Sequence, residues 1–136
     1  MPNNQQLPIL AASACVRRGA EVLLVQRGKE PGKGKWAFPG GKVCWGETTS
    51  QAALRELQEE CSISAKLSHL IGLYDVVQPT YHFAIACYFG CEPEGQLQAA
   101  SDAADARWFN IDEIHTLALA SNIAAAVRAS ENFLRL

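Results

Sequence analysis

One window of the sequence holds six residues whose spacing could support metal chemistry. They are Gly41, Glu47, Arg55, Glu56, Glu59 and Glu60. A helix repeats every ~3.6 residues, so the last three glutamates would project along one stripe of a helix. Like charges at this spacing repel by a few tenths of a kcal/mol per pair, and a hard divalent cation with oxygen ligands would offset that repulsion. The stripe is therefore a candidate site for Mg²⁺ or Mn²⁺.

The full spacing is more informative than the acidic stripe alone. Glu-rich helix faces are common and usually solvated, so E-x-x-E-E by itself would not indicate a site. Six specified positions at roughly 6% each, over ~100 starting points, match by chance on the order of 10⁻⁵ of the time. The window GKVCWGETTSQAALRELQEECSI resembles the signature of the Nudix hydrolases, G-x5-E-x7-R-E-U-x-E-E-x-G-U, where U is aliphatic.

Two aliphatic positions and one departure complete this resemblance. Leu57 and Ile63 fill both U positions, whereas Ser62 stands where the family has glycine. That glycine ends the helix in a left-handed conformation, which serine adopts at a cost of roughly 1–2 kcal/mol. We expect an altered helix C-cap with the chemistry retained. The flanking KGKWAFPGG also looks Nudix-like.

The resemblance implies a Mg²⁺-dependent (or Mn²⁺-dependent) hydrolase that cleaves the pyrophosphate linkage of a nucleoside diphosphate derivative. By resemblance, the metal ligands would be Glu59, Glu60, Glu56 and the Gly40 carbonyl, and Glu56 could instead accept the proton of the attacking water. Catalytic support would come from an ion pair between Arg55 and Glu47 that orients Glu56. The alternative for Arg55 is an ordinary i,i+4 surface pair with Glu59.

Residues outside the signature supply further candidates. An auxiliary acid could come from the polar segment 92–105, with Asp102 and Asp105 ranked first. Arg27 ends a predicted strand before a flexible loop, where its guanidinium could hold a phosphate or a ribose. Gly41 could let the backbone approach a ligand closely. Trp36 is the first candidate to stack on a base; the other aromatic candidates are Tyr74, Tyr81 and Trp108.

The substrate is open among three hypotheses. The segment SDAADARWFNIDEI is similar to a run in small Nudix proteins of the ADP-ribose pyrophosphatase group, which favours ADP-ribose or a related derivative. The first alternative is a pyrophosphatase that removes dNTPs or their 8-oxo forms from the nucleotide pool. The second is a non-hydrolysing module that senses a nucleotide, although such modules usually lack some of the acids, and all four glutamates are present here.

Composition bounds the class of protein. The 136 residues fit one domain, 1–136, with enough chain to bury ~65–70% of its unfolded surface. A net charge of −2 does not indicate the basic surface that proteins binding a nucleic acid polymer usually have. Five cysteines without a C-x-x-C pair and the lack of a long apolar run predict a cytoplasmic protein that does not cross a membrane. The composition also permits a homodimer.

The elements that must position the acids follow from periodicity and turn residues. Strands are predicted at 8–16, 21–25, 36–38, 63–77, 81–91 and 105–109, with turns at 17–19 and 39–41 and a loop at 27–35. One helix begins at Thr48, with Gln51 completing a capping box, and others run from Asn110 towards Leu119 and over 121–134. This order predicts an α/β/α sandwich with a mixed sheet between helices.

Overall fold

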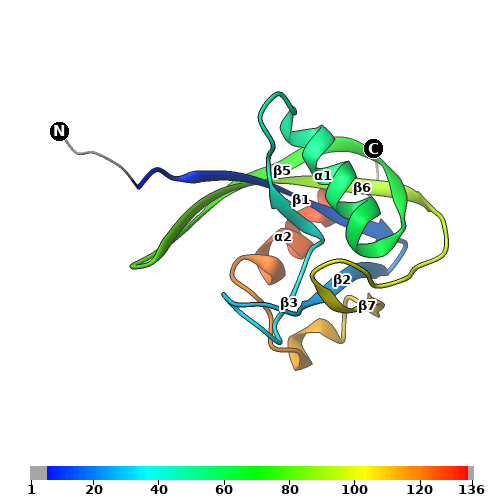
Figure 1. The fold of residues 1–136 in the computed structure, drawn as a ribbon. Helices are drawn as coiled ribbons and strands as arrows, with labels where there is room; N and C mark the ends of the chain where they lie inside the picture. The colour runs from blue at the N-terminus through cyan, green and yellow to red at the C-terminus, as the bar shows by residue number, and fades with distance from the viewer. Residues whose placement is uncertain (1–5, 135–136) are drawn as a thin grey trace.

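A seven-stranded mixed sheet lies at the centre of the protein (Figure 1). The computed structural model describes residues 6–134. The strands are β1 (Ile9–Arg18), β2 (Glu21–Arg27), β3 (Trp36–Ala37), β4 (Gly40–Lys42), β5 (Ser64–Gln78), β6 (Tyr81–Glu94) and β7 (Ala103–Asn110). Their order is β3-β2-β1-β6-β5, with β4 also paired to β1 and β7 to β2. β1 and β6 are parallel, and the other pairs are antiparallel.

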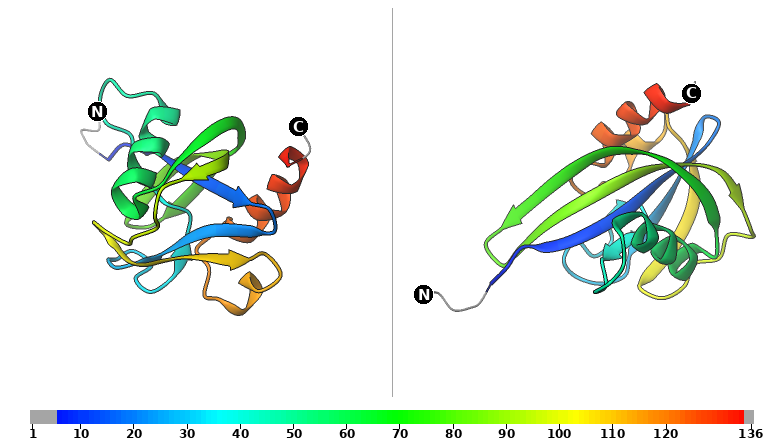
Figure 2. Two further views of the ribbon diagram at one scale, coloured as in Figure 1. Left: turned by 90° about the vertical axis from the view of Figure 1, so that its right-hand side faces the viewer. Right: turned by 90° about the horizontal axis from the view of Figure 1, so that it is seen from above.

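Helices cover the two faces of this sheet. α1 (Thr49–Cys61) packs on one face and α2 (Ile123–Ser130) on the other (Figures 1 and 2). Successive side chains of a strand point to opposite faces, so Ala14 and Val16 of β1 join the α1 core while Cys15 joins the α2 core. The predicted α/β/α sandwich with a mixed sheet is confirmed. Among residues 6–134, no helix has the length and apolar character needed to cross a membrane.

Both ends of α1 have the caps that the sequence predicted. The Thr48 side chain accepts a hydrogen bond from the Gln51 backbone, and the Gln51 side chain accepts one from the Thr48 backbone, which completes the capping box. Ser62 at the other end has φ 59° and ψ 31°, the left-handed conformation expected where the family has glycine. Its N–H donates to the Gln58 carbonyl at 3.0 Å. The helix therefore ends at the position expected for the family glycine, although that position holds serine.

The prediction of a helix from Asn110 towards Leu119 is wrong. Only a 3₁₀ turn, η1 (Ile114–Thr116), forms there. The Asn110 side chain accepts a hydrogen bond from the Asp112 backbone at 2.9 Å, so it closes a tight turn instead of capping a helix. The last helix is also shorter than 121–134, because it ends at Ser130 and a 3₁₀ turn, η2 (Glu131–Phe133), follows.

Two predicted turns differ in detail from the structure. Arg17 and Arg18 are part of β1, paired with Val22 and Glu21, and the turn lies at Gly19, which has φ 59°. Residues 40–42, which follow Pro39, form β4 on the edge of β1. This pairing holds the glycine segment directly beside α1, where the acidic stripe lies.

Candidate active site

Arg55 ties the acidic helix to the loop that precedes it. Its Nε donates to Glu47 Oε2 at 2.6 Å and its Nη2 to Glu47 Oε1 at 3.0 Å, a two-point contact with one carboxylate. Nη1 donates to Glu56 and to Glu59, each at 2.8 Å, and Nη2 also reaches the Lys42 carbonyl at 3.0 Å. Both predicted pairings of Arg55 are therefore present, and one guanidinium sets the positions of three glutamates.

The opposite charges of Arg55 and Glu47 shift the pKa of each group towards its charged form. Hydrogen bonds from Arg55 and from the Cys44 backbone lower the pKa of Glu47 from 4.5 to about 2. The same contacts with Glu47, Glu56 and Glu59 raise the pKa of Arg55, which stays charged. The loop 43–48 and α1 are thereby joined by an ion pair in which both side chains are charged at neutral pH.

Glu60 is the buried member of the stripe. Its exposed fraction is 9%, and its Oε1 accepts a hydrogen bond from the Gly40 N–H at 3.0 Å. Burial raises the pKa of Glu60 from 4.5 to about 7, the Gly40 bond lowers it, and the nearby charge of Glu56 raises it further. A carboxylate held in this way is stabilised by any cation that comes within reach.

Gly41 gives Glu56 its place. A Cβ atom at position 41 would lie 2.7–2.8 Å from the three terminal atoms of the Glu56 carboxylate, closer than van der Waals contact permits. A Cβ at Gly40 would collide with the Ala12 carbonyl oxygen at 2.5 Å. Gly41 is therefore required because β4 passes directly under Glu56, and Gly40 because β4 passes close to the backbone of β1.

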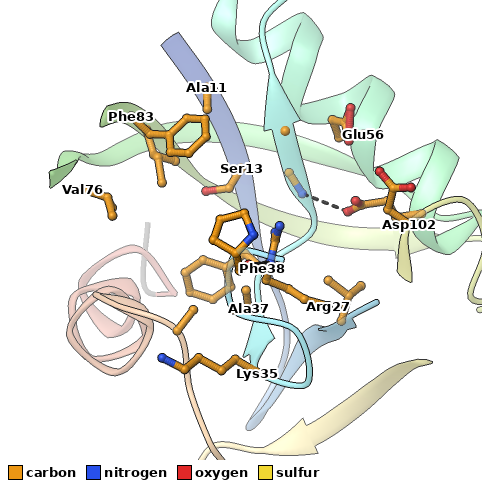
Figure 3. A pocket seen from close by; sticks show the side chains of 18 of the residues that line it. Ala11, Ser13, Arg27, Lys35, Ala37, Phe38, Glu56, Val76, Phe83 and Asp102 are labelled. Carbon is orange, nitrogen blue, oxygen red and sulfur yellow. Dashed lines mark hydrogen bonds between the residues drawn. The ribbon is translucent and has the colours of Figure 1, made fainter. Parts of the chain in front are cut away.

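A cavity of about 650 Å³ opens beside these acids (Figure 3). Glu56, Glu60 and Asp102 line one end of it. A wall from the β5–β6 hairpin, mostly apolar, lines another side with Tyr74, Val76, Tyr81, Phe83 and Ile85. Residues from the start of α2 close a third side. A cavity with acids at one end and aromatic side chains along its length suits an elongated ligand with a polar, anionic part and a flat, apolar part.

The structure gathers most of the candidate residues around this cavity and separates two of them from it. Those that line it are Arg27, Gly40, Gly41, Arg55, Glu56, Glu60 and Asp102. Glu47 and Glu59 are joined to the cavity wall through Arg55. Trp36 is buried in the core, with its ring edge-on to Phe109 at 4.9 Å. Asp105 pairs with Arg107 at 2.8 Å and does not line the cavity.

The acids offer a hard divalent cation the oxygen donors that it prefers. Within residues 6–134, no three His, Cys, Asp or Glu side chains already converge as a metal cage. Glu56 and Glu59 are turned towards Arg55 instead. Because the buried Glu60 lies close to the charge of Glu56 and is only partly compensated, the donor set fits Mg²⁺ or Mn²⁺ once Glu56 or Glu59 turns towards Glu60.

Tyr74 and Tyr81, two of the aromatic candidates, line the wall opposite the acids, but the sequence did not single out other residues of the cavity. Phe83 and Ile85 of β6 line the cavity, as does Lys35, which lies in the segment predicted only as a polar loop. The alternation of β6 predicts two faces but not which face meets a cavity. Lys35 could have been singled out only by knowing how the loop folds back on β2.

Comparisons with known proteins agree with this geometry. The NUDIX domain family model matches residues 7–130. An ADP-ribose pyrophosphatase of Methanocaldococcus jannaschii is 32% identical over 113 residues, which cover 82% of this chain and 67% of the relative. An oxidized purine nucleoside triphosphate hydrolase of Danio rerio is 38% identical over 95 residues, 68% of this chain and 60% of that protein. The chain thus spans about two thirds or less of these relatives.

A solved structure shows the same fold. The crystal structure of a MutT NUDIX hydrolase from Burkholderia pseudomallei matches with a TM-score of 0.84 at 25% sequence identity. The match covers 91% of this chain and 98% of that chain. The layers and strand order described above are therefore those of a known architecture.

Proposed function

Because the chain belongs to the NUDIX domain family, we propose that it is a Mg²⁺- or Mn²⁺-dependent hydrolase that cleaves the pyrophosphate linkage of a nucleoside diphosphate derivative. The observation that carries this proposal is the position of the acids of α1 at one end of the 650 Å³ cavity. We further propose that residues 1–136 act as a single domain.

The metal would be held by oxygen atoms from two elements. Glu56, Glu59 and Glu60 of α1 and the Gly40 carbonyl of β4 would be its ligands. When bound, the metal supplies positive charge that neutralises the diphosphate oxygens and the departing phosphate. Gly40 has a second role, because its N–H binds Glu60 Oε1 and fixes that carboxylate against β4.

The protein side chains would position and activate the attacking water. Glu56, held by Arg55 at 2.8 Å in the space that the missing side chain of Gly41 leaves, is the first candidate to accept the proton of that water. Water then attacks one phosphorus, the bond from that phosphorus to the bridging oxygen breaks, and the bridging oxygen leaves with the other phosphate. Arg55 and Glu47 are positioning residues, because they act through Glu56.

Asp102 is the candidate for an auxiliary acid. It lines the cavity and pairs with Lys29 at 2.9 Å, with both side chains more than half exposed. Asp105 lies outside the cavity, so it is the weaker of the two acids predicted from the sequence. Replacing Asp102 by asparagine removes both the ion pair and a role in proton transfer, whereas Lys29→Met removes the ion pair alone, so comparing kcat for the two variants separates the roles.

The favoured substrate is ADP-ribose or a closely related derivative. Support comes from the SDAADARWFNIDEI segment and from the ADP-ribose pyrophosphatase that is 32% identical. A second candidate, hydrolysis of (8-oxo-)dNTPs, is supported by the 38% identity to an oxidized purine nucleoside triphosphate hydrolase. The cavity wall of the β5–β6 hairpin could accept the base of either substrate.

One incubation distinguishes these substrates. The purified protein is mixed with Mg²⁺ and, separately, ADP-ribose, NADH, dGTP and 8-oxo-dGTP, and the products are resolved by chromatography. AMP plus ribose 5-phosphate supports the favoured substrate, and a nucleoside monophosphate plus pyrophosphate supports the second candidate. Binding without turnover of any substrate, with Mg²⁺ or Mn²⁺, would contradict the hydrolase and favour a nucleotide sensor.

A further inference from the structure

Two cationic side chains lie next to each other on the cavity wall. Arg27 ends β2, and its N–H donates to the Lys35 carbonyl at 2.9 Å, so the two residues face each other across the 28–34 loop. A Cβ at Gly32 would be 3.5 Å from Arg27 Cδ and 3.8 Å from Lys35 Cδ. Both stems therefore pass the same backbone position, and both residues line the cavity.

Neither of these cations has an acidic partner in the part of the chain that the structure describes. The ion pairs of residues 6–134 include Lys29 with Asp102 and Arg55 with three glutamates, but none that involves Arg27 or Lys35. Arg27 donates from Nε to the Pro31 carbonyl at 2.7 Å, which fixes the guanidinium and leaves its other nitrogens available. Both charges on this wall are therefore available to an anionic ligand.

The pair is placed where an anionic ligand would pass. Figure 3 shows Lys35 on the side of the cavity away from Glu56, with Arg27 between them. Arg27 lines the same cavity as Glu56 and Glu60. A ligand that begins at the acids and extends along the cavity would therefore meet Arg27 first and Lys35 next.

We propose that Lys35 is a substrate-binding residue of this site, which binds an oxyanion of the substrate beyond Arg27. The guanidinium of Arg27 supplies a planar pair of donors to the ligand, and the ammonium of Lys35 is a compact point charge further along the cavity. The oxyanion is a phosphate of the diphosphate or a further phosphate carried by the substrate. This inference rests on the proposed hydrolase function.

Lys35→Met tests the proposal, and Lys33→Met is its matched control. Lys33 lies in the same loop and loses the same charge, but it does not line the cavity. Removing a contact that substrate and transition state share should raise KM about tenfold and leave kcat within about twofold. Lys35→Arg should keep a KM close to that of the wild type. Lys35 has an exposed side chain and makes its fold contacts through its backbone, so melting temperatures should agree.

Comparing ADP-ribose with ADP-ribose 2′-phosphate shows which phosphate supplies the oxyanion. If the loss with Lys35→Met is equal for ADP-ribose and for ADP-ribose 2′-phosphate, the oxyanion belongs to the diphosphate. If the loss is larger for the 2′-phosphate, the site selects the extra phosphate. Equal kinetics for Lys35→Met and Lys33→Met would overturn the proposal, as would a collapse of kcat with KM unchanged.

Calorimetry keeps this test independent of catalysis. Binding of α,β-methylene-ADP, which carries a non-hydrolysable diphosphate, is measured for the wild type and both variants in the presence of Mg²⁺. The proposal requires Lys35→Met to bind about tenfold more weakly than Lys33→Met. If the wild type hydrolysed none of the substrates, the hydrolase function would fail, and this comparison would still decide the role of Lys35.

Discussion

The buried Glu60 predicts a conflict between stability and function that Glu60→Gln should expose. The glutamine keeps the shape of the side chain and can still accept the Gly40 hydrogen bond, which is 3.0 Å long. It removes a carboxylate whose charge is costly to bury, since burial raises the pKa of Glu60 to about 7. Without metal, the variant should therefore be more stable than the wild type wherever Glu60 would be ionised.

The size of the gain follows from the pKa. A group with a folded-state pKa raised from 4.5 to about 7 favours folding at low pH, and the folded state loses stability as pH rises through this interval. Each pKa unit corresponds to 1.36 kcal/mol, so ionised Glu60 destabilises the metal-free protein by up to about 3 kcal/mol above pH 7. For a domain of this length, that corresponds to a rise of about 10 °C in melting temperature on substitution.

Thermal unfolding in EDTA at pH 8 and at pH 4.5 measures this effect. Glu60→Gln should melt well above the wild type at pH 8 and close to it at pH 4.5. Glu113→Gln, at an exposed position outside the cavity, is the matched control and should change neither temperature. With Mg²⁺, the wild type should recover stability and the variant should not. A Glu60→Gln protein that melts below the wild type at pH 8 would show that ionised Glu60 does not destabilise the metal-free fold.

Three further substitutions probe the elements around the site. Hydrogen bonds from Arg55 lower the pKa of Glu47 to about 2, so ionised Glu47 stabilises the fold above pH 4.5, and this stabilisation is lost as pH falls through 2. Stability measured against pH by circular dichroism should therefore depend less on pH for Glu47→Gln than for the wild type. An unchanged pH dependence would contradict the ion pair. Gly41→Ala would place a Cβ 2.7 Å from Glu56 and displace its carboxylate, so it should lower kcat about 100-fold with little change in melting temperature. A kcat equal to that of the wild type would mean that the position of Glu56 does not depend on Gly41. Ser62→Gly should raise the free energy of unfolding by up to about 1 kcal/mol, because Ser62 has φ 59°. If chemical denaturation shows a lower free energy of unfolding for the variant, the serine side chain stabilises the cap.

The acidic stripe, its helix and the fold class could be predicted because each depends on local spacing. Thr48 and Gln51 are three residues apart, so their capping box is visible in the sequence and is formed in the structure. The contact of Arg55 with Glu47 spans eight residues within one loop and helix, which also leaves a local signature.

Features that depend on distant contacts could not be predicted in this way. Asn110 has the residue type of a helix cap, but its side chain binds Asp112 and the chain turns instead. Trp36 occupies a strand position from which a ring could reach a ligand or the core, and only the packing of Phe109 against it decides for the core. Lys35 likewise reaches the cavity because the loop after β2 folds back on that strand.

We expect the glutamates of α1 to hold the divalent metal of the hydrolase. Titration of the purified protein with Mn²⁺, followed by electron paramagnetic resonance of the free ion, measures this directly. The wild type should bind Mn²⁺, and Glu59→Gln should bind it at least about tenfold more weakly, with the same melting profile as the wild type in EDTA. If Glu59→Gln and Glu60→Gln both bound Mn²⁺ as tightly as the wild type, the metal site would lie elsewhere and the account would be contradicted.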